Sequence, residues 1–305
     1  MTRHLLTLTD LGPKGLLEML DAADRWQRVR GRPDAPRPLA GKSVALVFEK
    51  ASTRTRLSLE IAVAELGGHP VVLTSSGSQL ERGEPIADTA RVLTRMVHAI
   101  TFRTSSAERL EQLVRNSTVP VLNALTDTGH PMQLLADLQT VRRVRGKLDG
   151  LHYAWVGDGN NMANSWIEAA GLLGLELVLA CPEGYDPDAA MLENATRRGA
   201  KVRVVRDAKE AVRGAHVIST DVFASMGQES EAAVRRNAFR DFMVSRELLR
   251  HAAPDATVLH CLPAHRGEEI EAEVIDSPNS AIWDQAEARL HTAKAALEWA
   301  LGGDG

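Results

Sequence analysis

A run of small hydroxyl residues and arginines, STRTR, is the first stretch of the chain that could do chemistry. It directly follows a β-rich run, so Ser52, Thr53 and Thr55 would lie where a strand ends and a helix begins. Backbone N–H groups and hydroxyls at such a point converge and can hold an anion. Arg54 and Arg56 add planar guanidinium groups that suit bidentate phosphate contacts. An ordinary Ser/Thr helix cap with solvated arginines is the alternative.

A glycine-rich turn in the second half of the chain, GDGNNM, directly follows the β-rich run LHYAWV. It resembles the start of the dinucleotide-binding fingerprint G-x-G-x-x-G, except that Met162 replaces the third glycine. Asn160 and Asn161 at the carboxyl end of a strand suggest hydrogen bonds to a small polar ligand instead. A turn that caps the next helix explains the same residues equally well.

Histidine, cysteine and glutamate gather in HCLPAHRGEE, residues 260–269, after another β-rich run. These residue types could bind a metal, but their spacing matches no standard zinc pattern. A nucleophilic cysteine is a second possibility, for which one cysteine near a histidine is weak evidence. Pro263 instead favours a fixed turn that presents backbone carbonyls and the Cys261 thiol. We therefore predict no metal site here.

Two shorter stretches also place polar side chains at the ends of predicted elements. GHPMQ precedes the helical run LLADLQTV, so His130 and Gln133 would project from a helix start, where a structural histidine is the more common outcome. DVFASMG follows the run HVIST and offers Asp221 and Ser225 as ligand candidates, with an N-cap as the alternative. Ligands of open α/β sheets bind outside the carboxyl ends of the strands, and nearly all of these motifs lie there. Their joint placement is stronger evidence for a binding site than any one motif.

The elements that must position these residues alternate along the chain. Short β-rich runs and amphipathic helical runs follow one another, which is the pattern of parallel sheets with helices on both faces. The predicted strands are 43–48, 70–73, 99–102, 119–122, 151–156, 175–180, 201–205, 215–219 and 256–259. Residues 86–97 show the period of about 3.6 that is typical of a helix. Because the polar stretch 142–150 interrupts the pattern as a linker would, we predict two α/β domains, each a doubly wound parallel sheet, that meet near residue 145.

Length and composition restrict the class of protein. A chain of 305 residues suggests two domains of about 150 residues each. The formal net charge of −4 provides no broad positive field, so we expect no binding to nucleic acid or to a membrane surface. The chain begins without the apolar region of a signal peptide, and no apolar run approaches the roughly 18 residues of a membrane span. Two cysteines, Cys181 and Cys261, are too few for a disulfide framework and favour reduced thiols in the cytoplasm.

Seven motifs in this order resemble those of the ornithine carbamoyltransferases, within the aspartate/ornithine transcarbamoylase family. They are STRTR, FRT, HPMQ, GDGNNMANS, DVFASMG, HCLPAHRGEE and DQAEARLH. STRTR and HPxQ mark transcarbamoylases in general, whereas SMG together with HCLP is typical of the ornithine type. The resemblance extends from about residue 40 to the C-terminus.

The resemblance implies a fold and a reaction. Members of the family are trimers of two-domain α/β subunits that transfer the carbamoyl group of carbamoyl phosphate to L-ornithine, which gives L-citrulline and phosphate. The amine would attack directly, without a covalent enzyme intermediate, a metal or an organic cofactor. Residues 1–145, completed by a C-terminal helix over 285–301, would bind carbamoyl phosphate, and residues 146–284 would bind ornithine. The active site would lie in the cleft between these domains.

The resemblance also implies roles for individual residues. The carbamoyl-phosphate site would consist of Ser52, Thr53, Arg54, Thr55, Gln79, Arg103, His130, Pro131, Met132, Gln133 and Arg289. The ornithine site would consist of Asn161, Asp221, Ser225, Met226, Cys261 and Leu262. The catalytic residues would be Arg103, His130, Cys261 and Arg289. Within these sets, Cys261 would position the amine rather than attack, and Gln79 would reach the site of a neighbouring subunit.

Two departures from the family pattern concern substrate specificity more than reaction type. Phe223 stands where the family usually has tryptophan, and Met132 stands where a small or polar residue is usual. Three alternatives remain: a transcarbamoylase for another amine such as putrescine, a nicotinamide-dependent oxidoreductase, and a catalytically silent paralogue. Asp221 and Ser225 favour a zwitterionic amino acid over putrescine, and an oxidoreductase would leave STRTR and HPMQ without a role.

Overall fold

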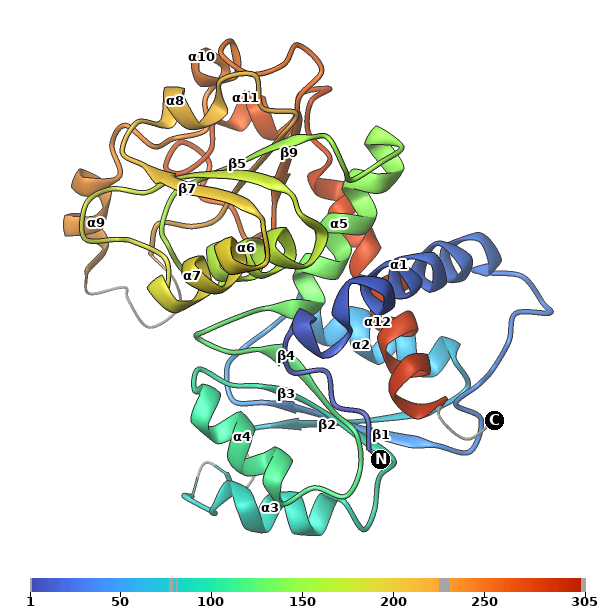
Figure 1. The fold of residues 1–305 in the computed structure, drawn as a ribbon. Helices are drawn as coiled ribbons and strands as arrows, with labels where there is room; N and C mark the ends of the chain where they lie inside the picture. The colour runs from blue at the N-terminus through green and yellow to red at the C-terminus, as the bar shows by residue number, and fades with distance from the viewer. Residues whose placement is uncertain (1, 77–78, 81, 225–230, 303–305) are drawn as a thin grey trace. The chain divides into compact units, whose positions relative to one another are not determined.

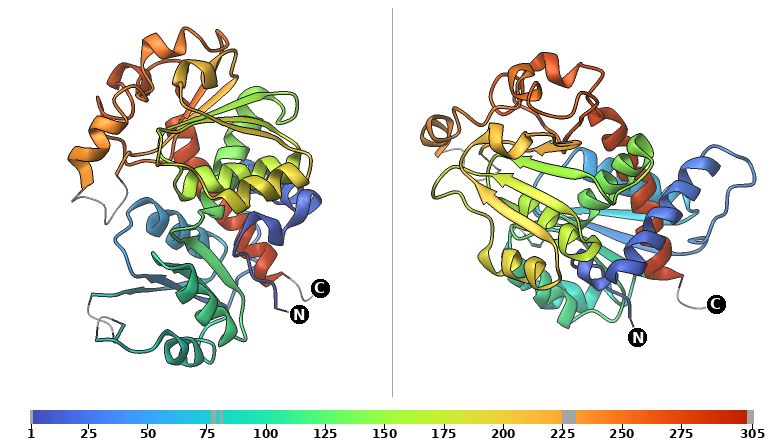
Figure 2. Two further views of the ribbon diagram at one scale, coloured as in Figure 1. Left: turned by 60° about the vertical axis from the view of Figure 1, so that its left-hand side comes forward. Right: turned by 45° about the horizontal axis from the view of Figure 1, so that its top comes forward.

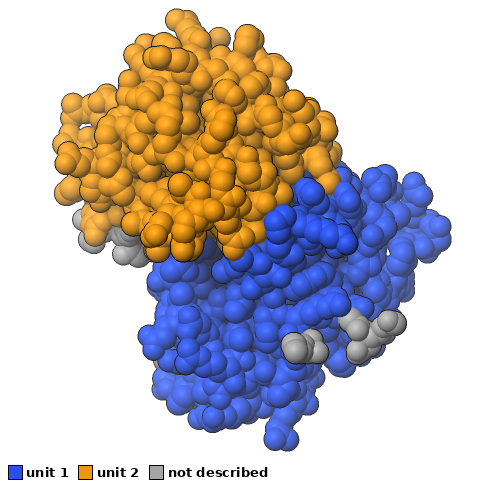
Figure 3. Space-filling model, in the orientation of Figure 1, with its two compact units in different colours: residues 1–139, 287–305 blue, residues 140–286 orange. Residues whose placement is uncertain are grey.

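The computed structural model describes residues 2–76, 79–80, 82–224 and 231–302, and Figure 1 shows its helices and strands. The chain forms two compact units, which Figure 3 colours separately. Unit 1 contains residues 1–139 and 287–305, and unit 2 contains residues 140–286. Two helices, α5 (Pro131–Arg145) and α12 (Ile282–Leu301), contain residues of both units. The two units divide between residues 139 and 140, inside α5, whereas the sequence predicts a division near residue 145, where α5 ends.

Unit 1 is built on a parallel four-stranded sheet in the order β2-β1-β3-β4. Its strands are β1 (Ser43–Phe48), β2 (His69–Thr74), β3 (Ala99–Arg103) and β4 (Val121–Leu125). β1 is a continuous apolar run that is buried along almost all of its length, as expected for a strand covered on both faces. The helices that lie wholly in this unit are α1 (Gly12–Val29), α2 (Arg54–Glu65), α3 (Ile86–Leu93) and α4 (Ala107–Arg115), preceded by the 3-10 helix Leu8–Asp10. Figure 1 shows α3 and α4 on one face of the sheet and α2 on the other.

Unit 2 is built on a parallel five-stranded sheet in the order β7-β6-β5-β8-β9. Its strands are β5 (His152–Val156), β6 (Glu176–Ala180), β7 (Lys201–Val205), β8 (Val217–Thr220) and β9 (Thr257–His260). The helices that lie wholly in this unit are α6 (Asn161–Leu173), α7 (Ala189–Arg197), α8 (Ala208–Val212), α9 (Ala232–Ala238), α10 (Arg246–Leu249) and α11 (Ala272–Ile275). Figures 1 and 2 show α6 and α7 along one face of the sheet and α8 on the other.

The strand order of each sheet reverses at one point. In unit 1 the chain adds β2 on one side of β1 and then returns to add β3 on the other side. In unit 2 it adds β6 and β7 on one side of β5 and then returns to add β8. Open α/β sheets bind ligands beyond the carboxyl ends of the strands at such a reversal. The STRTR and GDGNN motifs follow β1 and β5, the strands at these two points.

The sequence predictions agree with this fold, and the differences lie at the ends of elements. Each of the nine predicted strands is present, and the largest shift affects β4, predicted at 119–122 and found at Val121–Leu125. The helix predicted over 86–97 ends at Leu93, because the chain then tightens into turns in which the N–H of Met96 donates to the carbonyl of Leu93 at 2.9 Å. The predicted linker 142–150 begins inside α5. No helix within the described parts of the chain is both long and apolar enough to cross a membrane.

Candidate active site

The STRTR segment of unit 1 begins a helix without using its hydroxyl groups as caps. Thr53 is the N-cap residue of α2, but its side chain accepts no capping hydrogen bond. Arg54, the first residue of the helix, is half-buried, and its side chain forms no hydrogen bond or ion pair with any residue that the structure describes. An ordinary Ser/Thr cap is therefore wrong for this helix. The hydroxyls of Ser52 and Thr53 and the guanidinium of Arg54 remain available to a ligand at the positive end of α2.

Two arginines from distant parts of the chain converge on the hydroxyl of Thr55. Arg103, the last residue of β3, donates from Nη1 to Thr55 Oγ1 at 3.2 Å, and Arg289, on α12, donates to the same oxygen from Nη2. All three side chains are buried, with exposures of 2% for Thr55, 8% for Arg103 and 6% for Arg289. Two cations that share one neutral acceptor repel each other, and an anion bound beside them would offset that repulsion. This cluster is the strongest electrostatic evidence for an anion site in unit 1.

His130 and Gln133 lie at the start of α5, as predicted, and both are buried. Burial, followed by the charges of Arg289 and Arg103, holds the pKa of His130 well below its usual range, so the imidazole is neutral at pH 7. Gln133 donates from Nε2 to Asp137 Oδ1 at 2.8 Å, which orients its amide. Its oxygen, Oε1, is buried and accepts no hydrogen bond from the described residues. The helix start thus offers a neutral histidine and an amide oxygen that can still accept a hydrogen bond.

Three other predicted residues of the carbamoyl-phosphate site have less distinctive surroundings. Pro131 and Met132 form the buried beginning of α5. Gln79 lies in an exposed turn between β2 and α3, where its carbonyl accepts from the N–H groups of Arg82 and Glu84. Among the described residues, the Gln79 side chain makes no hydrogen bond to the other predicted site residues.

The GDGNN turn of unit 2 is shaped by packing and by capping. A Cβ atom at Gly159 would lie 2.2 Å from the backbone nitrogen of Pro187, so only glycine fits at this position. Asn160 is the N-cap of α6 and accepts from the N–H groups of Met162 at 2.9 Å and Ala163 at 3.3 Å. The capping interpretation is therefore right for Asn160. Asn161 follows it as the first residue of the helix.

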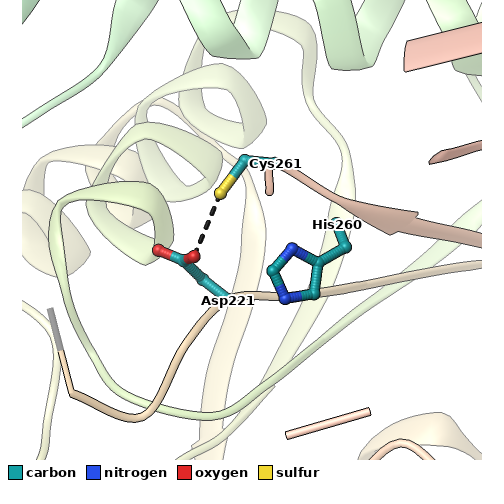
Figure 4. A group of neighbouring side chains, drawn as sticks. All are labelled: Asp221, His260 and Cys261. Carbon is teal, nitrogen blue, oxygen red and sulfur yellow. Dashed lines mark hydrogen bonds between the residues drawn. The ribbon is translucent and has the colours of Figure 1, made fainter. Parts of the chain in front are cut away.

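Asp221 directly follows β8 and lies at the centre of the polar cluster in unit 2. Its Oδ2 accepts from Asn160 Nδ2 at 3.0 Å, and its Oδ1 accepts from its neighbour's N–H, that of Val222, at 2.8 Å. The Cys261 thiol donates to the same Oδ1 at 3.0 Å, and Figure 4 shows this contact. Three strands thus contribute: Asn160 follows β5, Asp221 follows β8 and Cys261 follows β9. The predicted ornithine residues Asp221 and Cys261 are brought together, whereas Ser225 and Met226 lie outside the described residues.

A buried histidine and a buried glutamate hold the HCLP segment in place. Asp221, His260 and Cys261 place potential ligand atoms near one another, as do His265, Glu268 and Glu269. However, His260 Nδ1 accepts from the N–H of Leu262 at 2.9 Å, so its proton is on Nε2, which lies 3.0 Å from Glu269 Oε1. Because both ring nitrogens are engaged, hydrogen bonding accounts for the position of His260 without a metal.

Leu262 has a backbone conformation that L-residues rarely adopt. Its φ is 59°, and it is the one non-glycine residue of the described chain with a positive φ. Such a conformation costs about 1–3 kcal/mol and persists where the surroundings enforce it. The hydrogen bond to His260 is one such constraint. It fixes the position of Leu262, which we predicted to lie beside the side-chain amine of ornithine.

Sequence reasoning missed a buried ion pair beside this cluster. Arg235 of α9 donates from Nη1 to Asp158 Oδ2 at 2.8 Å and to the carbonyl of Phe223 at 3.0 Å. Its guanidinium also lies 5.0 Å from the centre of the Tyr185 ring. Burial is the main reason that the pKa of Asp158 is raised, although Arg235 offsets part of this effect. Asp158 lies inside the GDGNN turn and Arg235 lies inside the polar stretch 226–241, and neither residue stands out by its type or spacing.

The two departures from the family pattern are apolar residues in buried positions. Phe223 stacks on Phe239 with ring centres 4.6 Å apart, and Met132 is buried at the start of α5. Neither occupies the place of an assigned polar group. Cys181 is fully buried, and burial raises the pKa of its thiol to about 12, so it is not a reactive group.

Known proteins match this chain along its whole length. Residues 3–143 match the carbamoyl-P binding domain of aspartate/ornithine carbamoyltransferases, and residues 149–300 match the Asp/Orn binding domain of the same proteins. The ornithine carbamoyltransferase of Acidothermus cellulolyticus is 54% identical over 310 residues, which cover 100% of this chain and 98% of that protein. The corresponding protein of Geobacter metallireducens is 52% identical over 299 residues, which cover 97% and 98%. The solved structure of ornithine carbamoyltransferase from Pyrococcus furiosus superimposes with a TM-score of 0.94 at 47% identity and covers 100% of this chain and 98% of that one.

Proposed function

The chain belongs to the aspartate/ornithine carbamoyltransferase family, and we propose from this how its residues carry out the ornithine carbamoyltransferase reaction. The function is transfer of the carbamoyl group of carbamoyl phosphate to the side-chain amine of L-ornithine, which gives L-citrulline and phosphate. We assign residues 1–145 and 285–301 to carbamoyl phosphate and residues 146–284 to ornithine. The carbon–nitrogen bond forms, the carbon–oxygen bond to phosphate breaks, the proton lost by the attacking amine leaves with the phosphate, and no enzyme group is acylated.

The convergence of Arg103 and Arg289 on Thr55 is the observation that carries this proposal. Carbamoyl phosphate is an anion with its own leaving group, so the enzyme must mainly orient the reactants and stabilise charge. Ser52, Thr53, Arg54 and Thr55 would hold the phosphate at the start of α2. Arg54 would stabilise the charge that grows on phosphate as it departs, because its planar group can bind two phosphate oxygens at once.

The carbamoyl group would be held by residues at the beginning of α5 together with Arg103 of β3 and Arg289 of α12. Arg103 and His130 would donate hydrogen bonds to its carbonyl oxygen, where negative charge develops. Because the pKa of His130 is lowered, its contribution is an N–H dipole rather than a positive charge. The buried Oε1 of Gln133 would accept from the carbamoyl NH₂ group, whose donors need a partner in a buried site. Pro131 and Met132 would shape this pocket, and Arg289 would complete it.

The ornithine side requires an amine that has lost its proton. By analogy with lysine the amine has a pKa of about 10.4, so the neutral form at pH 7 costs ~4 to 5 kcal/mol. Neighbouring arginines lower this cost by like-charge repulsion, which predicts a rate that increases above neutral pH. Asp221, Asn161, Ser225 and Met226 would bind the amino-acid end. Cys261, held by Asp221, and Leu262 would position the side-chain amine.

A homotrimer would complete the active site, because Gln79 would reach the carbamoyl phosphate bound by a neighbouring subunit. Its exposed position supports this assignment. Three large apolar side chains are also exposed and would suit contact with another copy: Leu57 on α2, Val92 on α3, and Met96 in the turn after α3. We propose a cytoplasmic enzyme that needs no metal or organic cofactor. Sedimentation velocity should give the mass of three chains or a multiple of it.

One assay tests the function and its closest alternative. Purified protein is mixed with carbamoyl phosphate and either L-ornithine or putrescine, and the carbamoylated product and phosphate are measured across pH. We expect citrulline and phosphate in equal amounts, a rate that rises above pH 7, and little product with putrescine. Formation of the putrescine product at a comparable rate would contradict the substrate assignment. A covalent carbamoyl adduct on Cys261 would contradict direct attack.

A further inference from the structure

Three side chains outside the assigned site connect the carboxyl ends of β1 and β3 in unit 1. Glu49 directly follows β1, and Thr104 directly follows β3. Thr104 Oγ1 donates to Glu49 Oε2 at 2.5 Å, and Arg109 of α4 donates from Nε to Glu49 Oε1 at 2.9 Å and from Nη2 to the same oxygen. We name Glu49, Thr104 and Arg109 the strand-end clamp. Thr104 is the last residue of the FRT motif, and the sequence assigned no role to any of the three residues.

The clamp is bonded to the backbone that carries the anion site. The N–H of Glu49 donates to the carbonyl of Arg103 at 2.9 Å, so the first residue after β1 is tied to the last residue of β3. The N–H of Thr104 donates to the carbonyl of Leu125 at 3.0 Å, which ties the same point to β4. Only two residues separate Glu49 from Ser52. A change in the clamp would therefore move the backbone of Arg103 and the start of the phosphate-binding segment.

The position of Glu49 is otherwise hard to explain. A carboxylate three residues before an anion site repels the anion, unless a cation and a hydroxyl group engage both of its oxygens. Thr104 is fully buried, and 15% of the Glu49 side chain is exposed, so the contact between them is shielded from solvent. Arg109 is more exposed, at 38%, and an ion pair there would by itself contribute little to stability. These contacts are therefore better explained by their effect on the position of the nearby backbone than by a contribution to the stability of the whole protein.

We propose that the strand-end clamp positions Arg103 and residues 52–55 for carbamoyl phosphate, with Glu49 and Thr104 as positioning residues that do not touch the substrate. This inference rests on the proposed function, because it assigns a role in binding the same anion. It predicts that changes in the clamp weaken binding of the anion and leave binding of ornithine unchanged.

Thr104→Val tests the clamp because it removes one hydroxyl and keeps the shape of the side chain. We expect the KM for carbamoyl phosphate to rise about tenfold, the size of effect that loss of one hydrogen bond to a charged group produces. The KM for ornithine should change by less than about twofold, whereas Thr104→Ser should recover most of the affinity for carbamoyl phosphate. The matched control is Glu111→Gln, which breaks the exposed pair of Glu111 and Arg115 on α4 and should change neither KM.

A second measurement separates failure of the clamp from failure of the function. Calorimetric titration with inorganic phosphate reports on the anion site without ornithine or turnover, and it is applied to the wild type, Thr104→Val and Arg109→Met. Both variants should bind phosphate several-fold more weakly. If the wild type forms no citrulline, the proposed function is wrong. If the wild type forms citrulline and both variants match its phosphate affinity and its KM for carbamoyl phosphate, the clamp is wrong.

Discussion

Removal of the Arg235 guanidinium should destabilise unit 2 more than any change in an exposed charge. Arg235→Met keeps most of the apolar side chain but leaves the Asp158 carboxylate, 11% exposed, without its cation. Breaking a buried ion pair in this way costs about 3–5 kcal/mol. The lost hydrogen bond to the Phe223 carbonyl adds about 1 kcal/mol. The free energy of unfolding is measured by urea denaturation at pH 8.

The pH dependence of this loss follows from Asp158. Burial already raises its pKa in the wild type, and removal of Arg235 raises it further. A carboxyl group whose pKa is higher in the folded state than in the unfolded state stabilises the fold at low pH, and that stability is lost as pH rises through the folded pKa. The deficit of Arg235→Met should therefore narrow as pH decreases from 8 through the folded pKa that Asp158 has in the variant, by at most about 1.4 kcal/mol per pH unit.

Two further variants test whether the buried pair of Arg235 and Asp158 causes the loss of stability. Asp158→Asn added to Arg235→Met removes the stranded charge and should recover at least half of the lost stability. Arg197→Met breaks an exposed pair with Glu193 on α7 and should cost less than about 1 kcal/mol. If Arg235→Met stays within about 1 kcal/mol of the wild type at every pH, or if Asp158→Asn gives no recovery, the buried pair does not have the role assigned to it.

Three other predictions concern the assigned site. Arg54→Lys keeps the charge but not the bidentate geometry, so kcat/KM for carbamoyl phosphate should decrease by about 100-fold; a near-normal value in steady-state assays would contradict bidentate binding. Cys261→Ser should raise the KM for ornithine while turnover persists. If turnover were lost completely while calorimetry still showed ornithine binding, Cys261 would act as a nucleophile and not as a positioning group. The free energy of unfolding should decrease by up to about 1.4 kcal/mol per pH unit below pH 6.5 on account of His130, because a histidine whose folded pKa is lowered binds protons more readily when unfolded. His130→Gln should remove that contribution from urea denaturation measured between pH 7 and 5, and an unchanged slope would show that His130 is not the source.

Local patterns were enough to predict where the two halves of the site begin. The apolar run of β1 followed by small hydroxyl residues predicts a strand that ends at a helix start, and both are present. The same reasoning left the role of Asn160 open, because a cap and a ligand contact require the same side chain. Hydrogen bonds to Met162 and Ala163 settle this in favour of the cap.

Contacts between distant residues could not be predicted from local patterns. Thr55 and Arg289 are 234 positions apart, and no periodicity relates a residue on α2 to one on α12. Only the resemblance to a family indicated that Arg289 returns to the anion site. The pair formed by Arg235 and Asp158 spans 77 positions and was missed, since a buried ion pair depends on how helices pack against strand ends.

The close packing at Gly159 affects how sequence variation in this chain should be interpreted. A saturation library would find almost no tolerated substitution there, because any side chain would collide with the backbone of residues 186 and 187. Such intolerance, next to polar residues assigned to ornithine, could be mistaken for contact with the substrate. A compensating change at those two positions cannot relieve the collision either, because backbone atoms are common to every amino acid. Invariance at this position would therefore record a steric limit of the fold, and it should be excluded when substrate specificity is inferred from sequence.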